Sequence, residues 1–60
     1  MDINIVLSLI NTKLRDFYSS KEELLDDMDS AYEMVKKLEE NGYEYSKELN
    51  RFVITQQTSN

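Results

Sequence analysis

The 60-residue chain contains no cysteine, no histidine and no proline, and it has a single glycine. Without cysteine it can form neither a disulfide nor a thiolate zinc site. Without histidine it lacks the commonest metal ligand and the commonest general base. One glycine cannot supply the glycine-rich loop that cradles phosphate groups. These absences remove most metal and cofactor chemistry, and we expect neither a metal nor a cofactor.

Catalysis has little support in the residues that are present. The serines have no histidine to activate them as nucleophiles. A carboxylate acts as a general acid or base when burial shifts its pKa, and the carboxylates here are expected on a solvent face. Asp26, Asp27 and Asp29 lack the glycine turn and the terminal glutamate of a calcium loop. We therefore predict no catalytic residues and expect that the protein is not an enzyme.

Size and charge limit the remaining possibilities. Seven basic residues stand against twelve acidic ones, which gives a formal net charge of −5. A chain this short buries only about 60% of the surface that its unfolded form exposes. Proteins of this size often add disulfides, a metal or a partner subunit. Because the composition excludes disulfides and disfavours a metal site, a partner subunit is the remaining means of stabilisation, and self-association could provide it.

The N-terminal segment does not resemble a targeting signal. Asp2 is acidic where a signal peptide is basic. The apolar stretch over residues 3–10 is interrupted by Asn4 and Ser8, and it is far shorter than the roughly 20 residues that span a bilayer. We expect a cytoplasmic protein without a membrane segment, of the small acidic kind found in bacteria or their phages.

Hydrophobic spacing predicts a first helix over residues 2 to 17 or 18. Asp2 is its expected N-cap. Ile5 and Leu9 lie about a third of a turn away from its apolar stripe. The stripe follows the i, i+3, i+4, i+7 rule and comprises Ile3, Val6, Leu7, Ile10, Leu14 and Phe17.

A second helix is predicted to begin at Ser20, because Ser20 and Glu23 match a capping box. Gly42 suits the left-handed residue that ends a helix. A second capping box starts at Ser30 and three aspartates lie nearby, so two helices are an alternative. The apolar stripe keeps its phase without an intervening glycine or proline, and this favours one long helix. The stripe comprises Leu24, Leu25, Met28, Ala31, Tyr32, Val35 and Leu38.

The last third of the chain predicts a β-hairpin. Tyr43 and Tyr45 share one face of a strand, as do Phe52 and Ile54, and Asn50 suits the left-handed position of a four-residue loop. The fold class is therefore α+β, with a helical hairpin before a two-stranded antiparallel β-hairpin. One domain over residues 1–55 and a disordered tail over 56–60 are expected. The predicted core comprises Ile3, Val6, Leu7, Ile10, Leu14, Phe17, Leu24, Met28, Tyr32, Val35, Leu38, Tyr43, Tyr45, Phe52 and Ile54.

Acidic residues form a candidate ridge on the predicted long helix. Its members project within about 60° of one another at 100° per residue, opposite the apolar stripe. They are Glu22, Asp26, Asp29, Glu33 and Glu40. Such a ridge is commonly a solvated face. It also fits a binding surface for a basic partner, or a mimic of the nucleic-acid backbone that blocks a DNA-binding protein.

One stretch resembles a winged helix-turn-helix domain. It runs from the Ser20-Lys21-Glu22-Glu23-Leu24-Leu25 start through Leu38-Glu39-Glu40-Asn41-Gly42-Tyr43 to the hairpin. The resemblance implies DNA binding, with Lys36, Lys37 and Arg51 as phosphate contacts. The family usually has about four more residues before this glycine, and these hold its turn. The would-be recognition helix, residues 30–40, carries three glutamates against two lysines, which is poor chemistry for approaching phosphates.

Elimination leads to a functional hypothesis. We expect a non-catalytic protein-binding module, a small regulator or inhibitor of a larger protein, and we do not expect a nucleic-acid partner. Ile5 and Leu9 lie outside the stripe that a helical hairpin buries, so they should form an apolar strip on the surface. Pairing of this strip with its own copy across a two-fold axis predicts a homodimer. The alternative is a monomer whose strip docks a different protein.

Overall fold

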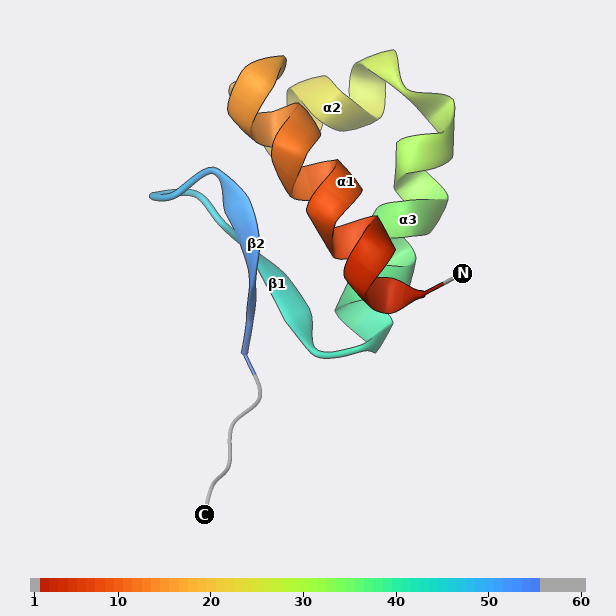
Figure 1. Ribbon diagram of the computed structural model, residues 1–60. Helices are drawn as coiled ribbons and strands as arrows, with labels where there is room; N and C mark the ends of the chain where they lie inside the picture. Colours follow the sequence, from red (N-terminus) through yellow and green to blue (C-terminus); the bar gives the residue numbers. More distant parts are fainter. Residues whose placement is uncertain (1, 56–60) are drawn as a thin grey trace.

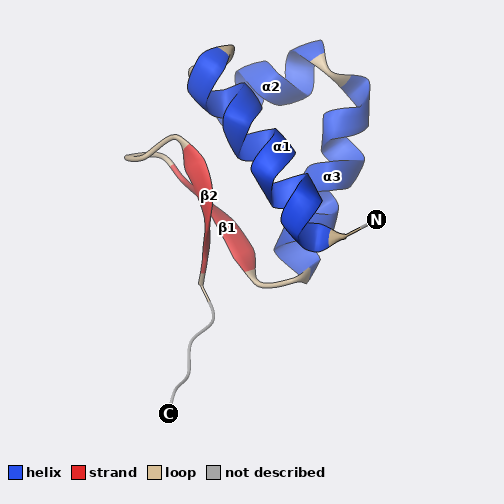
Figure 2. Ribbon diagram, viewed as in Figure 1, coloured by secondary structure: helices blue, strands red, loops and turns tan. Residues whose placement is uncertain are grey.

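The computed structural model describes residues 2–55, and the predicted disordered tail lies outside them. The architecture is α+β (Figures 1 and 2). Three helices come first: α1 (Ile3–Asp16), α2 (Lys21–Asp27) and α3 (Asp29–Glu40). Two antiparallel strands follow, β1 (Tyr43–Ser46) and β2 (Arg51–Ile54). The predicted fold class and the hairpin are confirmed, whereas the prediction of only two helices is wrong.

Helix ends fall where the sequence predicts them in three places. The Asp2 carboxylate accepts a hydrogen bond from the backbone N–H of Asn4 at 2.9 Å, so it caps α1. The Ser20 hydroxyl accepts one from the backbone N–H of Glu23 at 3.1 Å and caps α2. Gly42 has a φ of 89° just after α3, a left-handed conformation that glycine adopts without steric cost.

The predicted long helix is interrupted at Met28. This residue is extended, with φ −117° and ψ 107°, and it ends α2 and precedes α3. Aspartates surround the break: Asp27 ends α2 and Asp29 begins α3. Aspartate is a weak helix former that the helix dipole disfavours at a C-terminus and favours at an N-terminus. The capping box predicted at Ser30 is not used, because Ser30 lies inside α3.

The hairpin follows the predicted alternation. Tyr45 pairs with Phe52, and their rings lie 5.6 Å apart between centroids. Tyr43 pairs with Ile54 on the same face. Residues 47–50 form the loop, and Asn50 takes the left-handed conformation with a φ of 52°. The two strands are therefore joined by the four-residue loop that the sequence predicts.

The core lies between the three helices and the inner face of the hairpin. Its buried residues are Val6, Ile10, Leu14, Leu24, Ala31, Val35, Leu38 and Phe52. Half-buried apolar side chains pack around them, namely Ile3, Leu7, Tyr18, Leu25, Met28, Met34, Tyr43 and Tyr45. No helix within residues 2–55 has the length and apolar character needed to cross a membrane.

Three predicted core residues are exposed instead: Phe17 (68%), Tyr32 (64%) and Ile54 (55%). Phe17 follows the last residue of α1 and has left the helical conformation. Tyr32 lies at the edge of the stripe of α3, about 100° from Ala31, whereas Ala31, Val35 and Leu38 follow one another at i, i+4 and i+7 and are buried. Ile54 is the last residue of β2.

Candidate protein-interaction face on α1

Helix α1 presents apolar side chains on two different sides. Val6, Ile10 and Leu14 point into the core and are almost completely buried. Ile5 is 59% exposed and Leu9 is 37% exposed. These two residues are four positions apart, which places them next to each other on the helix surface. A continuous apolar strip therefore faces solvent.

The strip lies in a shallow hollow of about 440 Å³. None of the residues that line it is charged, although 32% of the chain is charged. We call this surface the uncharged face of α1, and it is lined by Asn4, Ile5, Ser8, Leu9 and Thr12. Exposed surfaces of a small acidic protein normally carry charge, so ten successive residues without any, 3–12, set this helix apart.

A different flank of α1 holds the hairpin. The Asn11 side-chain amide donates to the Phe52 carbonyl at 3.2 Å, and the Phe52 N–H donates to the Asn11 Oδ1 at 2.7 Å. The amide thus pairs with β2 as another strand would, and it satisfies backbone groups that a sheet edge otherwise leaves open. At 100° per residue, Asn11 lies about 160° from Leu9 around α1. The hairpin therefore leaves the uncharged face uncovered.

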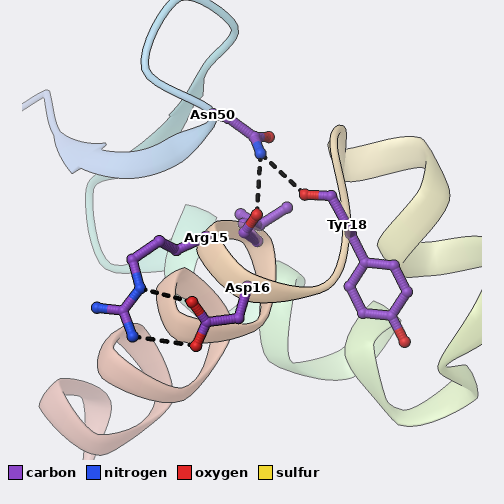
Figure 3. A network of polar contacts seen from close by, with 5 residues as sticks. Arg15, Asp16, Tyr18 and Asn50 are labelled. Carbon is purple, nitrogen blue, oxygen red and sulfur yellow. Dashed lines mark hydrogen bonds and ion pairs between the residues drawn. The ribbon is translucent and has the colours of Figure 1, made fainter.

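Asn50 makes the second connection between the hairpin and α1 (Figure 3). Its Nδ2 donates to the backbone carbonyl of Leu14 at 3.0 Å and to that of Tyr18 at 2.9 Å. Its Oδ1 accepts from the Tyr45 hydroxyl at 2.5 Å. One side chain thus satisfies the Leu14 carbonyl in the last turn of α1, where helix carbonyls lack partners, and the Tyr18 carbonyl just beyond it. It fixes the hairpin loop against both.

The C-terminal end of α1 is charged, unlike its first three turns. Arg15 donates to both carboxylate oxygens of Asp16, at 2.8 and 3.0 Å (Figure 3). These hydrogen bonds lower the pKa of Asp16. A second hollow, of about 530 Å³, lies between this end and the hairpin loop and also contains Arg51. The surface along α1 therefore changes from uncharged to charged toward its C-terminus.

Polar contacts also fix the turn between α1 and α2. The Glu23 carboxylate accepts from the Ser19 N–H at 2.8 Å and from the Ser19 hydroxyl at 3.0 Å, which lowers the pKa of Glu23. The sequence predicted that Glu23 would reach back to the N-cap, Ser20, and it reaches one residue further. The Tyr18 hydroxyl donates to Asp27 at 2.5 Å, which raises the pKa of Tyr18.

The five residues of the predicted acidic ridge are all exposed, but they do not share one helix. Glu22 and Asp26 lie on α2, whereas Asp29, Glu33 and Glu40 lie on α3. The ridge drawn on a continuous helix is therefore wrong. The three on α3 still project within about 40° of one another at 100° per residue. Within residues 2–55, no cluster of three or more acidic side chains is arranged to hold a metal ion.

Sequence reasoning missed Asn11 and Asn50 as the residues that hold the hairpin on α1. Asn50 was recognised only for its backbone conformation, and Asn11 was not singled out. Asn11 does leave a weak signal, because it is a polar residue beside the apolar stripe. Its partner lies 41 positions away, and local spacing carries no information about such a contact.

A family model described as "Domain of unknown function (DUF4250)" matches residues 1–52. The chain belongs to this family. No curated protein and no solved structure matches the chain. The DUF4250 match spans all three helices and β1, and it reaches Phe52 in β2. Both asparagines that hold the hairpin on α1 therefore lie within the DUF4250 region, as does the whole uncharged face.

Proposed function

We propose that this DUF4250 protein is a non-catalytic protein-binding module that contacts its partner through the uncharged face of α1. The observation that carries the proposal is the exposure of Ile5 and Leu9 among lining residues without charge. The cores of protein interfaces are depleted in charged residues. Complete burial of an isoleucine or leucine side chain contributes about 1.5–3 kcal/mol. Ile5 and Leu9 are partly exposed, so burying them against a partner would supply part of this free energy to binding.

A module of this kind acts as a regulator or inhibitor of a larger protein by occupying a surface on it. The polar residues around the strip, Asn4, Ser8 and Thr12, supply hydrogen-bonding groups at the rim, where interfaces are polar. Two apolar anchors make a small interface, and small interfaces are typical of reversible complexes. The expected binding is therefore reversible, as regulation requires.

Site-specific cross-linking in the source cell tests this proposal. A photo-cross-linking amino acid replaces Leu9 in one variant and Glu48 in a control, because Glu48 is an exposed residue of the hairpin loop. We expect a discrete protein adduct from position 9, reduced by an excess of unmodified protein, and none from position 48. The absence of any adduct from position 9 would contradict the proposal.

DNA binding is a second candidate, and the break at Met28 favours it. The order of three helices followed by a hairpin is that of a winged helix-turn-helix domain, with α3 in the place of the recognition helix. Lys36, Lys37 and Arg51 are all exposed. The side of α3 that faces away from the core, however, also carries Asp29, Glu33 and Glu40, as described above. These carboxylates repel phosphates and fit better a basic protein partner or the backbone-mimic hypothesis.

A gel shift with duplex DNA separates these candidates. A DNA-binding domain loses affinity as salt rises, and a Lys36→Gln/Lys37→Gln variant should flatten that salt dependence by about two units of slope. No shift at low salt would exclude this candidate. A mimic gives the opposite result, because it displaces DNA from the protein that it blocks.

A further inference from the structure

We propose that the partner at the uncharged face is a second copy of the chain, bound with the two α1 helices antiparallel across a two-fold axis. This inference rests on the proposed function of that face and names its partner. In a two-fold contact, if residue i touches residue j of the other copy, then j touches i. Ile5 therefore packs against Leu9 of the other copy and Leu9 against its Ile5, which closes the apolar strip on itself.

The side chains beside the strip allow the two helices to approach closely. Ser8 and Thr12 are short and line the same hollow as Ile5 and Leu9. Packed helices lie about 8–10 Å apart, depending on the side chains at the contact. Small residues around two apolar anchors favour the near end of that range. No charged side chain has to lose its water between the two helices, which avoids the penalty of burying charge.

Charges at the ends of α1 complement each other in the same register. Asp2 precedes Ile5 by three residues, and Lys13 follows Leu9 by four. When Ile5 lies opposite Leu9 of the other copy, Asp2 lies opposite the residue just before the other copy's Lys13. One residue corresponds to a rise of roughly 1.5 Å along the helix. The two-fold axis produces this contact twice. The Asp2 carboxylate is already held in place by the N–H of Asn4 at 2.9 Å.

The same charges disfavour the neighbouring register. Shifting the two helices until Leu9 meets Leu9 of the other copy places Asp2 opposite Asp16. Two carboxylates then face each other at both ends of the contact, and like charges across an interface reduce affinity. The charge pattern therefore favours the register in which Ile5 packs against Leu9 over the one in which Leu9 meets Leu9.

The contact is short, so the dimer should dissociate readily. A helix with the 14 residues of α1 is about 21 Å long at 1.5 Å per residue. Two such helices offer less than the roughly 1,200 Å² that stable complexes bury. The acidic residues of α2 and α3 are not part of this contact and stay exposed in the dimer.

Sedimentation equilibrium with a pair of charge-reversed variants tests the inference. Lys13→Glu and Asp2→Lys should each weaken dimerisation about tenfold or more, because each places like charges at both ends of the contact. An equimolar mixture of the two should recover the wild-type affinity, because every end contact in the mixed dimer joins opposite charges. Higher salt should reduce both effects, since exposed charges are screened.

A matched control separates the charge of Asp2 from its role as an N-cap. Asp2→Asn keeps a good capping residue and removes only the charge. It should weaken the dimer less than Asp2→Lys does, while circular dichroism shows unchanged helix content. If Asp2→Lys loses helix content, Lys13→Glu still tests the contact when it is measured alone and mixed with the wild type. The mixed dimer keeps one Asp2–Lys13 contact, so it should be tighter than the Lys13→Glu homodimer.

The outcomes distinguish this inference from the proposed function. A wild-type mass that stays at 7.1 kDa on concentration to the millimolar range overturns the dimer, as does a mixture that associates no better than either variant. If the wild type is monomeric while the cross-linker at position 9 captures a different protein, the second-copy inference fails and the binding module stands. If position 9 captures nothing, including another copy, both fail.

Discussion

The inner and the outer side of α1 carry similar aliphatic side chains, yet their surroundings differ completely. Ile10 is fully buried, whereas Ile5, five residues earlier on the same helix, is 59% exposed. The difference comes from what packs against each side, because α3 and β2 cover the inner side and one flank. Residue type alone does not decide burial in this protein, and the positions of the neighbouring elements do.

The comparison also shows what limits so small a protein. Two further short helices and one hairpin cannot surround a 14-residue helix. The sequence nevertheless keeps apolar residues on the uncovered side, where they contribute nothing to the core. The four predictions below test this contrast between a side that stabilises the fold and a side that is available to a partner.

The largest effect is expected from the inner side. Leu14→Ala should lower the free energy of unfolding by about 2–5 kcal/mol, because it leaves a cavity in a close-packed core. Ile5→Ala on the outer side is the control and should cost no more than about 1 kcal/mol. Urea unfolding of both variants measures the difference. Equal unfolding midpoints would show that the two sides of α1 do not differ as described.

Much of this fold could be predicted because local rules decide it. Capping by Asp2 and Ser20, the left-handed conformation of Gly42 and the hairpin loop ending at Asn50 all depend on a few neighbouring residues. Each was predicted and each is confirmed. The exposure of Ile5 and Leu9 also agrees with their position off the apolar stripe. Whether they bind a partner stays a prediction.

The features that could not be predicted depend on distant contacts or on weak preferences. The break at Met28 reflects the low helix propensity of the neighbouring aspartates, which costs only about a few tenths of a kcal/mol per residue. The apolar stripe keeps its phase through the break and so gives no sign of it. Tyr32 lies at the edge of the apolar stripe, so its exposure depends on which elements pack beside α3. The amide contacts of Asn11 and Asn50 join segments more than 30 positions apart, so no periodicity could show them.

The next largest effect is expected where the hairpin is attached to α1. Asn50→Gly keeps the left-handed conformation but removes the three side-chain hydrogen bonds, so it should cost about 1–3 kcal/mol. Glu48→Gly is the matched control in the same loop, because Glu48 is exposed. Thermal unfolding followed by circular dichroism measures both. If Asn50→Gly is as stable as the control, these hydrogen bonds do not hold the hairpin in place.

A smaller effect is expected at the junction between α3 and β1. Gly42→Ala should cost about 1–2 kcal/mol, because an L-residue with a side chain is strained in the left-handed region. A Cβ at this position would meet nothing within 4 Å, so the cost is conformational and not steric crowding by neighbours. Gly42→Asn should lose less, since asparagine tolerates this conformation. Equal losses for the two variants would point to a different cause.

The smallest effect on the folded monomer is expected from the outer side of α1. The double change Ile5→Gln/Leu9→Gln keeps good helix formers and removes the exposed apolar strip. It should alter the unfolding free energy of the monomer by no more than about 1 kcal/mol, because both side chains are partly exposed. A loss as large as that from Leu14→Ala would place these residues in the core and remove the proposed interaction face.

Protein concentration makes this last prediction sharper. If the wild type dimerises through the uncharged face, its unfolding midpoint should rise with concentration, because association stabilises the folded state by mass action. The double variant should show the same midpoint at every concentration, and it should match the wild type at the lowest one. A wild-type midpoint that does not depend on concentration, together with an unchanged midpoint in the variant, would leave the face open to a different protein, and the cross-linker at position 9 would then identify it.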